Sequence, residues 1–295
     1  MNPAELVFFD GALRPASEAG FRVDDHGVLF GCGFFETFRT SGGRPHDWSR
    51  HRDRLFTACE RAGIELPVTF LAWFEPALAM ACRGLLDARG WAEGVFRYTI
   101  TSGAPSSDGR YREPRELLSL RELPPEPPPH GVALRLLHLR RDTGEWLPRP
   151  KSVNYANAQA GLRELTSRGA DAADEGLFLS ADGFIVETPR QNLAWLYGDE
   201  IFTPATELGC VAGTGLSWVF DQGLASRYVR ARVEDIAGAD AVFAVNAVRG
   251  ITPVASIWDA ADQNQILTFD SAVNEKIVWL RQRWTAALAA TAAAR

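Results

Sequence analysis

The sequence predicts an α+β protein built from two domains, and three observations support this fold class. The chain has 295 residues, which is long for one small core and suits two domains of ordinary size. Both halves mix short apolar runs typical of strands with apolar residues at helical spacing. Between the halves, residues 123–131 hold five prolines, a composition that favours a stiff extended linker. We therefore predict a small domain at 1–122 and a large domain at 132–295.

The first domain is predicted to combine hairpin strands with two helices. Residues 6–9 lead into Asp10-Gly11, which is a hairpin turn signal. Ser49 stands at the expected N-cap of the first helix, and Gly90 ends the second. The expected elements are strands at 6–9, 34–40, 94–101 and 117–123 and helices at 49–62 and 70–89.

The second domain shows the same mixture of patterns. Its expected strands lie at 132–139, 175–180, 184–187, 192–197 and 241–245, the last followed by a loop at 246–253. Its expected helices lie at about 154–168, 215–230 and 270–290.

Composition and charge exclude several classes of protein. Apolar residues make up 46% and charged residues 23% of the chain, as in soluble globular proteins. The net charge of −6 argues against a nucleic-acid surface. We find no apolar run of membrane-spanning length and no signal peptide. The four cysteines have no CxxC spacing, so we expect reduced thiols in a cytoplasmic protein and no metal site.

Lys151 is the first candidate for chemistry. It and Lys276 are the only two lysines in a chain that otherwise uses arginine. Lys151 follows a strand and Pro150 and directly precedes a predicted helix, so it should project from a loop at a domain edge. A lysine amine attacks carbonyl groups only when it is deprotonated, which burial or a neighbouring cation favours. A solvated surface lysine is the alternative.

Glu187 is the second candidate, because it ends an otherwise apolar strand. A carboxylate there is costly unless it meets a cation. The protonated pyridine nitrogen of pyridoxal 5′-phosphate (PLP) is one such cation, and PLP works as an electron sink when that nitrogen is charged. Asn192 would brace Glu187 or simply start the next strand. An ordinary pair between Glu187 and Arg190 is the alternative.

A glycine-rich turn at 209–217 opens a predicted helix. Such a turn directs backbone N–H groups outward and favours a phosphate. It is not a Walker A loop, since no Gly-Lys-Ser/Thr follows, and Gly31-Cys32-Gly33 lacks the third glycine of a dinucleotide fingerprint.

In this order and spacing, the motifs resemble the class IV aminotransferases, the PLP enzymes of fold type IV, and most of all their aminodeoxychorismate lyases. The resemblance spans nearly the whole chain. It is carried by GCGFFETFR at 31–39, HRDRL at 51–55, Lys151 with Asn154-Tyr155, Asp174-Glu175, Glu187 with Asn192, Thr203-Pro204, Gly213-Thr214 and NAVRGITPV at 246–254. It implies a small N-terminal α/β sandwich-like domain and a larger domain with a β-barrel-like sheet and flanking helices.

The resemblance also implies a cofactor site. Lys151 would form the Schiff base with PLP and transfer protons, and Glu187 would pair with the pyridine nitrogen. The phosphate would be held by Arg54 and by the backbone N–H groups of Thr214 and Gly215. The residues implied to bind PLP are Arg54, Lys151, Tyr155, Glu187, Asn192, Gly213, Thr214 and Gly215. Tyr155 would bond the ring hydroxyl, and a homodimer is expected.

Three positions depart from the family pattern. Cys32 replaces a frequent aspartate, and His26 stands where arginine is common. Leu216 replaces the arginine that usually follows the phosphate turn, although a backbone cradle does not need that side chain.

Within the family, three features favour a lyase that converts 4-amino-4-deoxychorismate to 4-aminobenzoate and pyruvate. Thr37 in FETFR and the Asn246-Ala247-Val248 run are similar to lyase motifs, and Ser102 stands where D-amino-acid aminotransferases carry an arginine. Thr37 would relay a proton to the leaving group, or be a strand residue without a chemical role.

The substrate-side residues and two other functions stay open. Arg39, Arg97 and Arg110 are candidates for the substrate carboxylates, each otherwise an ordinary arginine, and backbone groups of Ala247 and Val248 would face a carboxylate. An aminotransferase of branched-chain or D-amino-acid type would share every PLP contact. A protein that kept the PLP fold as a binding module but lost catalysis is the third possibility, which Lys151, Glu187 and Arg54 together disfavour.

Overall fold

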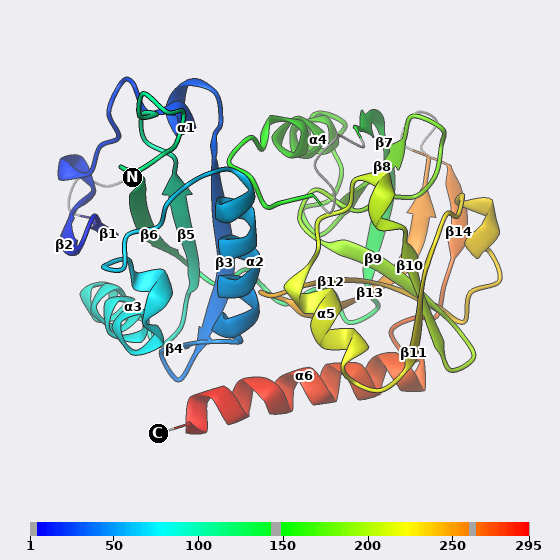
Figure 1. The fold of residues 1–295 in the computed structure, drawn as a ribbon. Helices are drawn as coiled ribbons and strands as arrows, with labels where there is room; N and C mark the ends of the chain where they lie inside the picture. The colour runs from blue at the N-terminus through cyan, green and yellow to red at the C-terminus, as the bar shows by residue number, and fades with distance from the viewer. Residues whose placement is uncertain (1–4, 143–148, 260–263, 295) are drawn as a thin grey trace. The chain divides into compact units, whose positions relative to one another are not determined.

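The computed structural model describes residues 5–142, 149–259 and 264–294. The chain divides into two compact units (Figure 1), which we describe separately. Unit 1 comprises Met1–Pro124, Pro150–Asn154 and Ala286–Arg295, and unit 2 comprises Pro125–Arg149 and Tyr155–Thr285. The division after Pro124 lies inside the proline-rich segment. The units are not two simple halves, because two short later segments pack with unit 1.

Unit 1 is built on a six-stranded sheet of order β2-β1-β6-β5-β3-β4, in which neighbouring strands are antiparallel. Its strands are β1 Leu6–Phe9, β2 Ala12–Pro15, β3 Gly33–Ser41, β4 Arg44–Pro45, β5 Val95–Thr101 and β6 Arg115–Arg121. Its helices are α1 His26–Leu29, α2 Trp48–Arg61 and α3 Glu75–Arg89, with short 3-10 turns η1 Ala16–Glu18 and η2 Leu71–Trp73.

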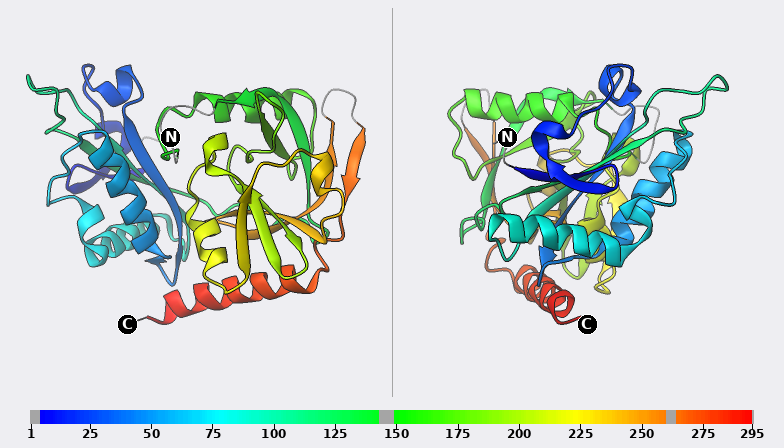
Figure 2. Two further views of the ribbon diagram at one scale, coloured as in Figure 1. Left: turned by 45° about the vertical axis from the view of Figure 1, so that its right-hand side comes forward. Right: turned by 90° about the vertical axis from the view of Figure 1, so that its left-hand side faces the viewer.

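The two faces of this sheet differ in character because successive strand residues point to opposite sides. On β3, Phe34 and Phe38 join the hydrophobic core, together with buried residues of α2 and α3, and these helices cover that face (Figure 2). Phe35 and Thr37 point to the other face. The β3–β5 register pairs Phe35 with Thr99 and Thr37 with Arg97, so these side chains share the face opposite the helices.

Residues 151–153, which include Lys151, pair through their backbone with the start of β3. The backbone N–H of Phe35 donates to the carbonyl oxygen of Lys151 at 2.8 Å, and that of Val153 donates to Gly33 at 3.0 Å. Phe34 and Ser152 form an antiparallel bridge. Lys151, predicted to belong to the large domain, therefore folds as part of unit 1 through strand-like pairing.

Unit 2 carries an eight-stranded mixed sheet of order β11-β10-β9-β12-β13-β7-β8, with β14 also paired to β13. The pairs β10–β11, β13–β7 and β7–β8 are parallel. The strands are β7 Val132–Arg141, β8 Glu175–Ser180, β9 Asn192–Tyr197, β10 Glu200–Pro204, β11 Ala225–Val229, β12 Ala241–Asn246, β13 Gly250–Trp258 and β14 Gln265–Thr268.

Helices of unit 2 pack closely against this sheet. They are α4 Ala156–Ser167, α5 Thr214–Phe220 and the part of α6 (Glu275–Ala293) up to Thr285, with 3-10 turns η3 Thr206–Leu208 and η4 Glu234–Ile236. In α4, a Cβ at Gly161 would lie 2.7 Å from the ring of Phe178, so glycine permits this close approach. Trp284 of α6 packs edge-to-face on Trp218 of α5, with ring centroids 5.0 Å apart.

Most elements lie where the sequence predicts them, and the α+β class is confirmed. Five predictions differ from the structure for identifiable reasons. The helix expected at 215–230 ends at Phe220, because Gly223 turns the chain at φ 90° and β11 then pairs with β10. The helix expected at 70–89 begins only at Glu75, since Pro76 is tolerated only in a first turn.

The other three differences are local. The loop expected at 246–253 contains the start of β13 at Gly250, which pairs directly with Asn246. The strand expected at 184–187 forms only isolated bridges. Helix α2 begins at Trp48 after Asp47 at φ 54°, so Ser49 lies inside the helix and is not its N-cap.

Candidate active site

Lys151 lies on the face of the unit 1 sheet that carries Phe35. Its Nζ lies 4.7 Å from the centroid of the Phe35 ring, and the guanidinium carbon of Arg97 lies 3.5 Å from the same centroid. Thr37 is the cross-strand partner of Arg97. An apolar ring and a second cation are surroundings that activate an amine nucleophile. Three of the sequence-predicted residues, Lys151, Thr37 and Arg97, are thus brought together.

The other two candidate arginines occupy different surroundings. Arg39 lies on β3 and pairs in register with Val95. Arg110 lies in the loop between β5 and β6, where its guanidinium pairs with Glu65 at 3.1 Å and both side chains are largely exposed. Of the three arginines, Arg97 is the one held against the ring next to Lys151.

Arg54, the predicted phosphate ligand, is bound to a buried carboxylate. Its Nε donates to Glu36 Oε1 at 2.9 Å, its Nη2 donates to Oε2 at 2.5 Å, and His51 Nδ1 lies 2.6 Å from Oε2. Burial alone would raise the pKa of Glu36, but Arg54 and His51 together lower it to about 2. Glu36 and His51 were not predicted from the sequence as site residues. Their signal was a lone acid among the apolar residues of β3 and a histidine three positions before Arg54.

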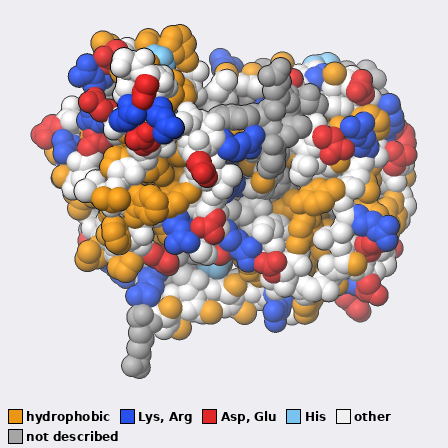
Figure 3. Space-filling model, in the orientation of Figure 1, with side chains coloured by type: hydrophobic (Ala, Val, Ile, Leu, Met, Phe, Trp, Pro, Cys, Tyr) orange, Lys and Arg blue, Asp and Glu red, His pale blue; other side chains and the backbone are white. Residues whose placement is uncertain are grey.

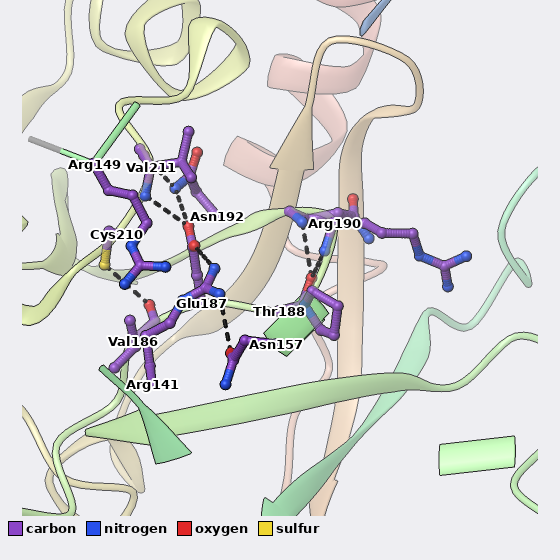
Figure 4. A network of polar contacts seen from close by, with 12 residues as sticks. Arg141, Arg149, Asn157, Val186, Glu187, Thr188, Arg190, Asn192, Cys210 and Val211 are labelled. Atoms are coloured by element: carbon purple, nitrogen blue, oxygen red, sulfur yellow. Dashed lines mark hydrogen bonds and ion pairs between the residues drawn. The ribbon is translucent and has the colours of Figure 1, made fainter. Parts of the chain in front are cut away.

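Glu187 is the centre of a polar network in unit 2 (Figure 4). Its Oε1 accepts from Nη2 of Arg141, and its Oε2 accepts from Asn192 Nδ2 at 3.1 Å and from the backbone N–H of Val211 at 3.0 Å. Arg190, the alternative partner, instead bonds Glu175 at 3.0 Å. The brace by Asn192 is therefore present, and the cation that meets Glu187 within the protein is Arg141.

Arg141 was not predicted from the sequence as a site residue. Its side chain and that of Glu187 are each 4% exposed, and it also donates to Asn157 at 3.3 Å. Burial and the nearby Arg141 lower the pKa of Arg149, so this end of unit 2 is rich in positive charge. The only signal in the sequence was an arginine at the end of the strand before Lys151.

This network leaves hydrogen-bonding groups unused among the described residues. An ionised carboxylate offers about four acceptor positions, and described donors fill three of those on Glu187. The Nε of Arg141 is buried with no hydrogen-bond partner among the described residues. A vacant acceptor position beside an unsatisfied donor suits a heterocycle with a protonated ring nitrogen and an oxygen substituent, and PLP is such a molecule.

The glycine-rich turn lies next to this network. A Cβ at Gly213 would lie 1.8 Å from Asn192 Oδ1, and one at Gly215 would lie 2.9 Å from the backbone of Asn246. Asn192 therefore links Glu187 to the start of α5, where Thr214 is the first helical residue. The side chain of Asn192 thus connects Glu187, the predicted partner of the ring nitrogen, with the predicted phosphate turn at the start of α5.

Two predicted contacts are occupied by protein groups. The hydroxyl of Tyr155 donates to the carbonyl oxygen of Pro189, and so secures the turn that follows Glu187. The backbone N–H of Val248 donates to Asn246 Oδ1 at 2.9 Å, as does that of Arg249 at 2.8 Å. Ala247 lies between these residues in the half-buried turn from β12 to β13.

The described part of the chain contains no group of three or more His, Cys, Asp or Glu residues arranged to hold a metal ion. Its helices include none that is long and apolar enough to cross a membrane. All four cysteines are free thiols.

Comparison with known proteins gives a consistent result. The family model for amino-transferase class IV matches residues 33–257. The chain is 31% identical to the aminodeoxychorismate lyase of Bacillus subtilis over 263 residues, which cover 85% of this chain and 86% of that one. It is 24% identical to a putative branched-chain-amino-acid aminotransferase of Methanocaldococcus jannaschii over 94% of this chain and 97% of the relative.

Solved structures show the same two groups of relatives. The 4-amino-4-deoxychorismate lyase of Pseudomonas aeruginosa is similar with a TM-score of 0.78 and 27% identity, over 95% of this chain and 98% of that one. A fold IV-transaminase of Curtobacterium pusillum gives a TM-score of 0.74 and 26% identity, over 95% and 91%.

Proposed function

The chain belongs to the class IV aminotransferase family, and from this premise we propose that it is a PLP-dependent lyase converting 4-amino-4-deoxychorismate to 4-aminobenzoate and pyruvate. The observation that carries the proposal is the sheet face that places Thr37 and Arg97 opposite each other, beside the ring on which Lys151 lies. The 31% identity to the lyase of Bacillus subtilis supports the choice of substrate.

The protein groups that would hold the cofactor are those that the family resemblance implies. Lys151 would attach it, Arg54 and the N–H groups of Thr214 and Gly215 would hold its phosphate, and Glu187 would pair with its ring nitrogen. When bound, PLP supplies an electron sink for the carbon that bears the substrate's amino group.

The protein's own groups then divide the reaction between them. The Lys151 amine takes the proton from the amine-bearing ring carbon, the neighbouring carbon–oxygen bond breaks, and the ring becomes aromatic. Thr37 relays a proton to the departing enolpyruvate, which becomes pyruvate. No water or oxidant is consumed, because the two products together contain the atoms of the substrate.

Arg97 and Glu187 supply fixed charges. The guanidinium of Arg97, held over Phe35, binds a substrate carboxylate, since a cation against an aromatic face is oriented and partly desolvated. Three hydrogen-bond donors hold the buried carboxylate of Glu187 in place. An ionised carboxylate keeps a pyridine nitrogen protonated.

Transamination is the second candidate function. It is favoured by the aminotransferase of Methanocaldococcus jannaschii, whose match covers 94% of this chain. In that case, the same lysine would return the proton one position along, and the amino group would pass to a 2-oxo acid. Lys151, Glu187 and Arg54 have the same roles in both reactions.

We further propose a homodimer in the cytoplasm. Figure 3 shows apolar side chains gathered on the surface of unit 1. Val23 and Phe30 of that unit are 88% and 69% exposed. Exposed apolar surface of this kind suits a subunit interface. The four free thiols suit a reducing compartment.

One experiment separates the two reactions. Purified protein with PLP is offered aminodeoxychorismate and, separately, a panel of D- and L-amino acids. Release of 4-aminobenzoate and pyruvate in equal amounts supports the lyase, whereas conversion of the cofactor to its amine form by an amino acid supports transamination. Lys151→Ala should abolish either activity and the visible absorbance of the lysine-bound cofactor.

Lys276→Ala is the matched control, because Lys276 is the other lysine of the chain and pairs with Asp199 at 2.8 Å. If it removed the absorbance band while Lys151→Ala kept it, the assignment of the cofactor to Lys151 would be wrong.

A further inference from the structure

We propose that Glu36 and His51 are positioning residues that orient the guanidinium of Arg54 toward the phosphate of the cofactor. The inference rests on the proposed function, because it takes Arg54 as a phosphate ligand. Neither Glu36 nor His51 touches the phosphate in this proposal. Both act through Arg54.

The geometry around Arg54 fixes the plane of its guanidinium. Glu36 Oε1 accepts from Nε at 2.9 Å and Oε2 accepts from Nη2 at 2.5 Å. Two parallel hydrogen bonds to one carboxylate hold a planar group against both translation and rotation. Because the guanidinium is rigid, fixing its Nε–Nη2 edge also fixes the direction of Nη1.

His51 in turn fixes the carboxylate. Its Nδ1 lies 2.6 Å from Glu36 Oε2, so that oxygen is held by groups from two positions of α2. The imidazole ring stacks on Trp48 with an interplanar angle of 15° and packs against Phe38. His51 and Arg54 are three residues apart on α2 and therefore share one face of the helix. The helix and the sheet thus determine the orientation of the pair together.

Burial indicates that this cluster does more than stabilise the fold. Glu36 and His51 are each 1% exposed, and Arg54 is 14% exposed. Removing two charges from water costs several kcal/mol per ion, and a well-packed apolar pair is often no less stable. A carboxylate on the core face of β3, between Phe34 and Phe38, is therefore a poor choice for stability alone. What the cluster does provide is a single fixed orientation of the Arg54 guanidinium.

The proposal predicts a phosphate-specific defect. Pyridoxal has the aldehyde and the ring of PLP but no phosphate, so its binding should not depend on the orientation of Arg54. In Glu36→Gln, one side-chain oxygen can still accept a hydrogen bond from Arg54. The negative charge and one of the two hydrogen bonds to the guanidinium are lost. Affinity for PLP should then fall about tenfold, a change of about 1.4 kcal/mol, while affinity for pyridoxal should change by less than about twofold.

The experiment measures dissociation constants of PLP and pyridoxal for the apoprotein by titration of the visible absorbance. Glu116→Gln is the matched control, because Glu116 is also a buried carboxylate of unit 1 but contacts Tyr98 and Leu71 rather than α2. His51→Leu should repeat the defect of Glu36→Gln. His51→Asn should restore part of the affinity, since an amide N–H can stand near the position of Nδ1.

Each outcome is decisive. If Glu36→Gln and His51→Leu weaken PLP and pyridoxal equally, or neither, the positioning role is overturned. If Arg54→Lys also leaves the ratio of the two constants unchanged, then Arg54 is not a phosphate ligand and both assignments fail. If the wild type forms no visible band with either aldehyde, the proposed function itself fails. A loss of PLP affinity in Glu36→Gln that Arg54→Lys reproduces supports the positioning role.

Discussion

Glu36 in unit 1 and Glu187 in unit 2 are both nearly fully buried, and each accepts hydrogen bonds from three described donors. The donors of Glu36 come from one helix and include both contacting nitrogens of Arg54. Those of Glu187 come from three separate segments: Arg141, Asn192 and Val211.

This difference indicates opposite roles for the same type of residue. Glu36 engages one edge of a flat cation and so controls where that cation points. Glu187 is itself controlled, because three segments fix its position while a fourth acceptor position stays vacant among the described residues. A buried carboxylate can therefore orient its arginine or be held in place by it. The number of chain segments that supply the hydrogen-bond donors distinguishes the two cases.

Glu116 shows what happens without a cation. It is as buried as Glu36, at 1% exposure, but among the described residues its side chain accepts from the Tyr98 hydroxyl and from the Leu71 N–H at 3.1 Å. Burial raises the pKa of Glu116 to about 7, whereas that of Glu36 is lowered to about 2. The sign of the shift is decided by the arginine and the histidine rather than by depth.

The strongest test of the comparison removes the buried partner of Glu187. Arg141→Met leaves a buried carboxylate without its cation, which should lower the free energy of unfolding by about 3–5 kcal/mol. Chemical denaturation of the apoprotein measures it. The matched control is Arg110→Met, because the Arg110–Glu65 pair is exposed and should be worth less than about 1 kcal/mol. Equal losses in the two variants would contradict the distinction between buried and exposed pairs.

The second test neutralises Glu187. Glu187→Gln keeps the hydrogen-bonding shape but removes the charge that holds a ring nitrogen protonated. We expect kcat to fall about 100-fold or more, a size typical of losing a preorganised electrostatic contact, while the cofactor stays bound. Steady-state kinetics and visible absorbance measure the two quantities. If the variant loses PLP affinity but keeps its kcat, Glu187 contributes to cofactor binding, as proposed for Glu36, and not to the chemical step.

The third test uses pH. Because the pKa of Glu116 is raised from its ordinary value of 4.5 to about 7, the folded state binds this proton more tightly than the unfolded state. Stability from this group is therefore complete below about pH 4.5 and is lost as the pH rises to about 7. Glu116→Gln should remove this loss and raise the free energy of unfolding at pH 8 by about 2–3 kcal/mol. Denaturation midpoints at pH 4 and pH 8 measure it, and a variant that is less stable at pH 8 would refute the assignment.

The smallest expected effect concerns the substrate arginine. Arg97→Ala should raise KM for aminodeoxychorismate about tenfold, the loss of one charge-assisted contact, whereas Arg110→Ala should leave KM unchanged. Initial-rate kinetics over a range of substrate concentrations distinguish them. A raised KM in Arg110→Ala alone would move the substrate carboxylate away from the face that carries Lys151.

The sequence singled out candidate site residues more readily than the partners that the structure gives them. Lys151 and Glu187 could be found because each is an exception to its surroundings, a rare lysine and an acid at the end of an apolar strand. Arg141 could not, because 46 positions separate it from Glu187 and no periodicity relates two positions so far apart. The same reason hides the pairing of Arg54 with Glu36.

The errors in the fold have a related cause. The residues of β11 were predicted as helix, although they pair with β10 in a parallel arrangement. Pairing with a strand distant in sequence overrides local preference. The start of β13 was predicted as a loop, although it pairs with β12 in an antiparallel arrangement. The resemblance to a family supplied the cofactor roles, which the residues alone left open.

The path of the chain at Pro150–Asn154 limits where this protein can be divided into fragments. These five residues belong to unit 1, while the residues immediately before and after them belong to unit 2. A fragment that stopped at Pro124 would lack the strand-like partner of Phe34 and Phe35, and so would expose unpaired backbone groups along β3. Exposed strand edges promote aggregation. The N-terminal region is therefore not an autonomous module, and genetic dissection or domain exchange must carry the lysine peptide with it.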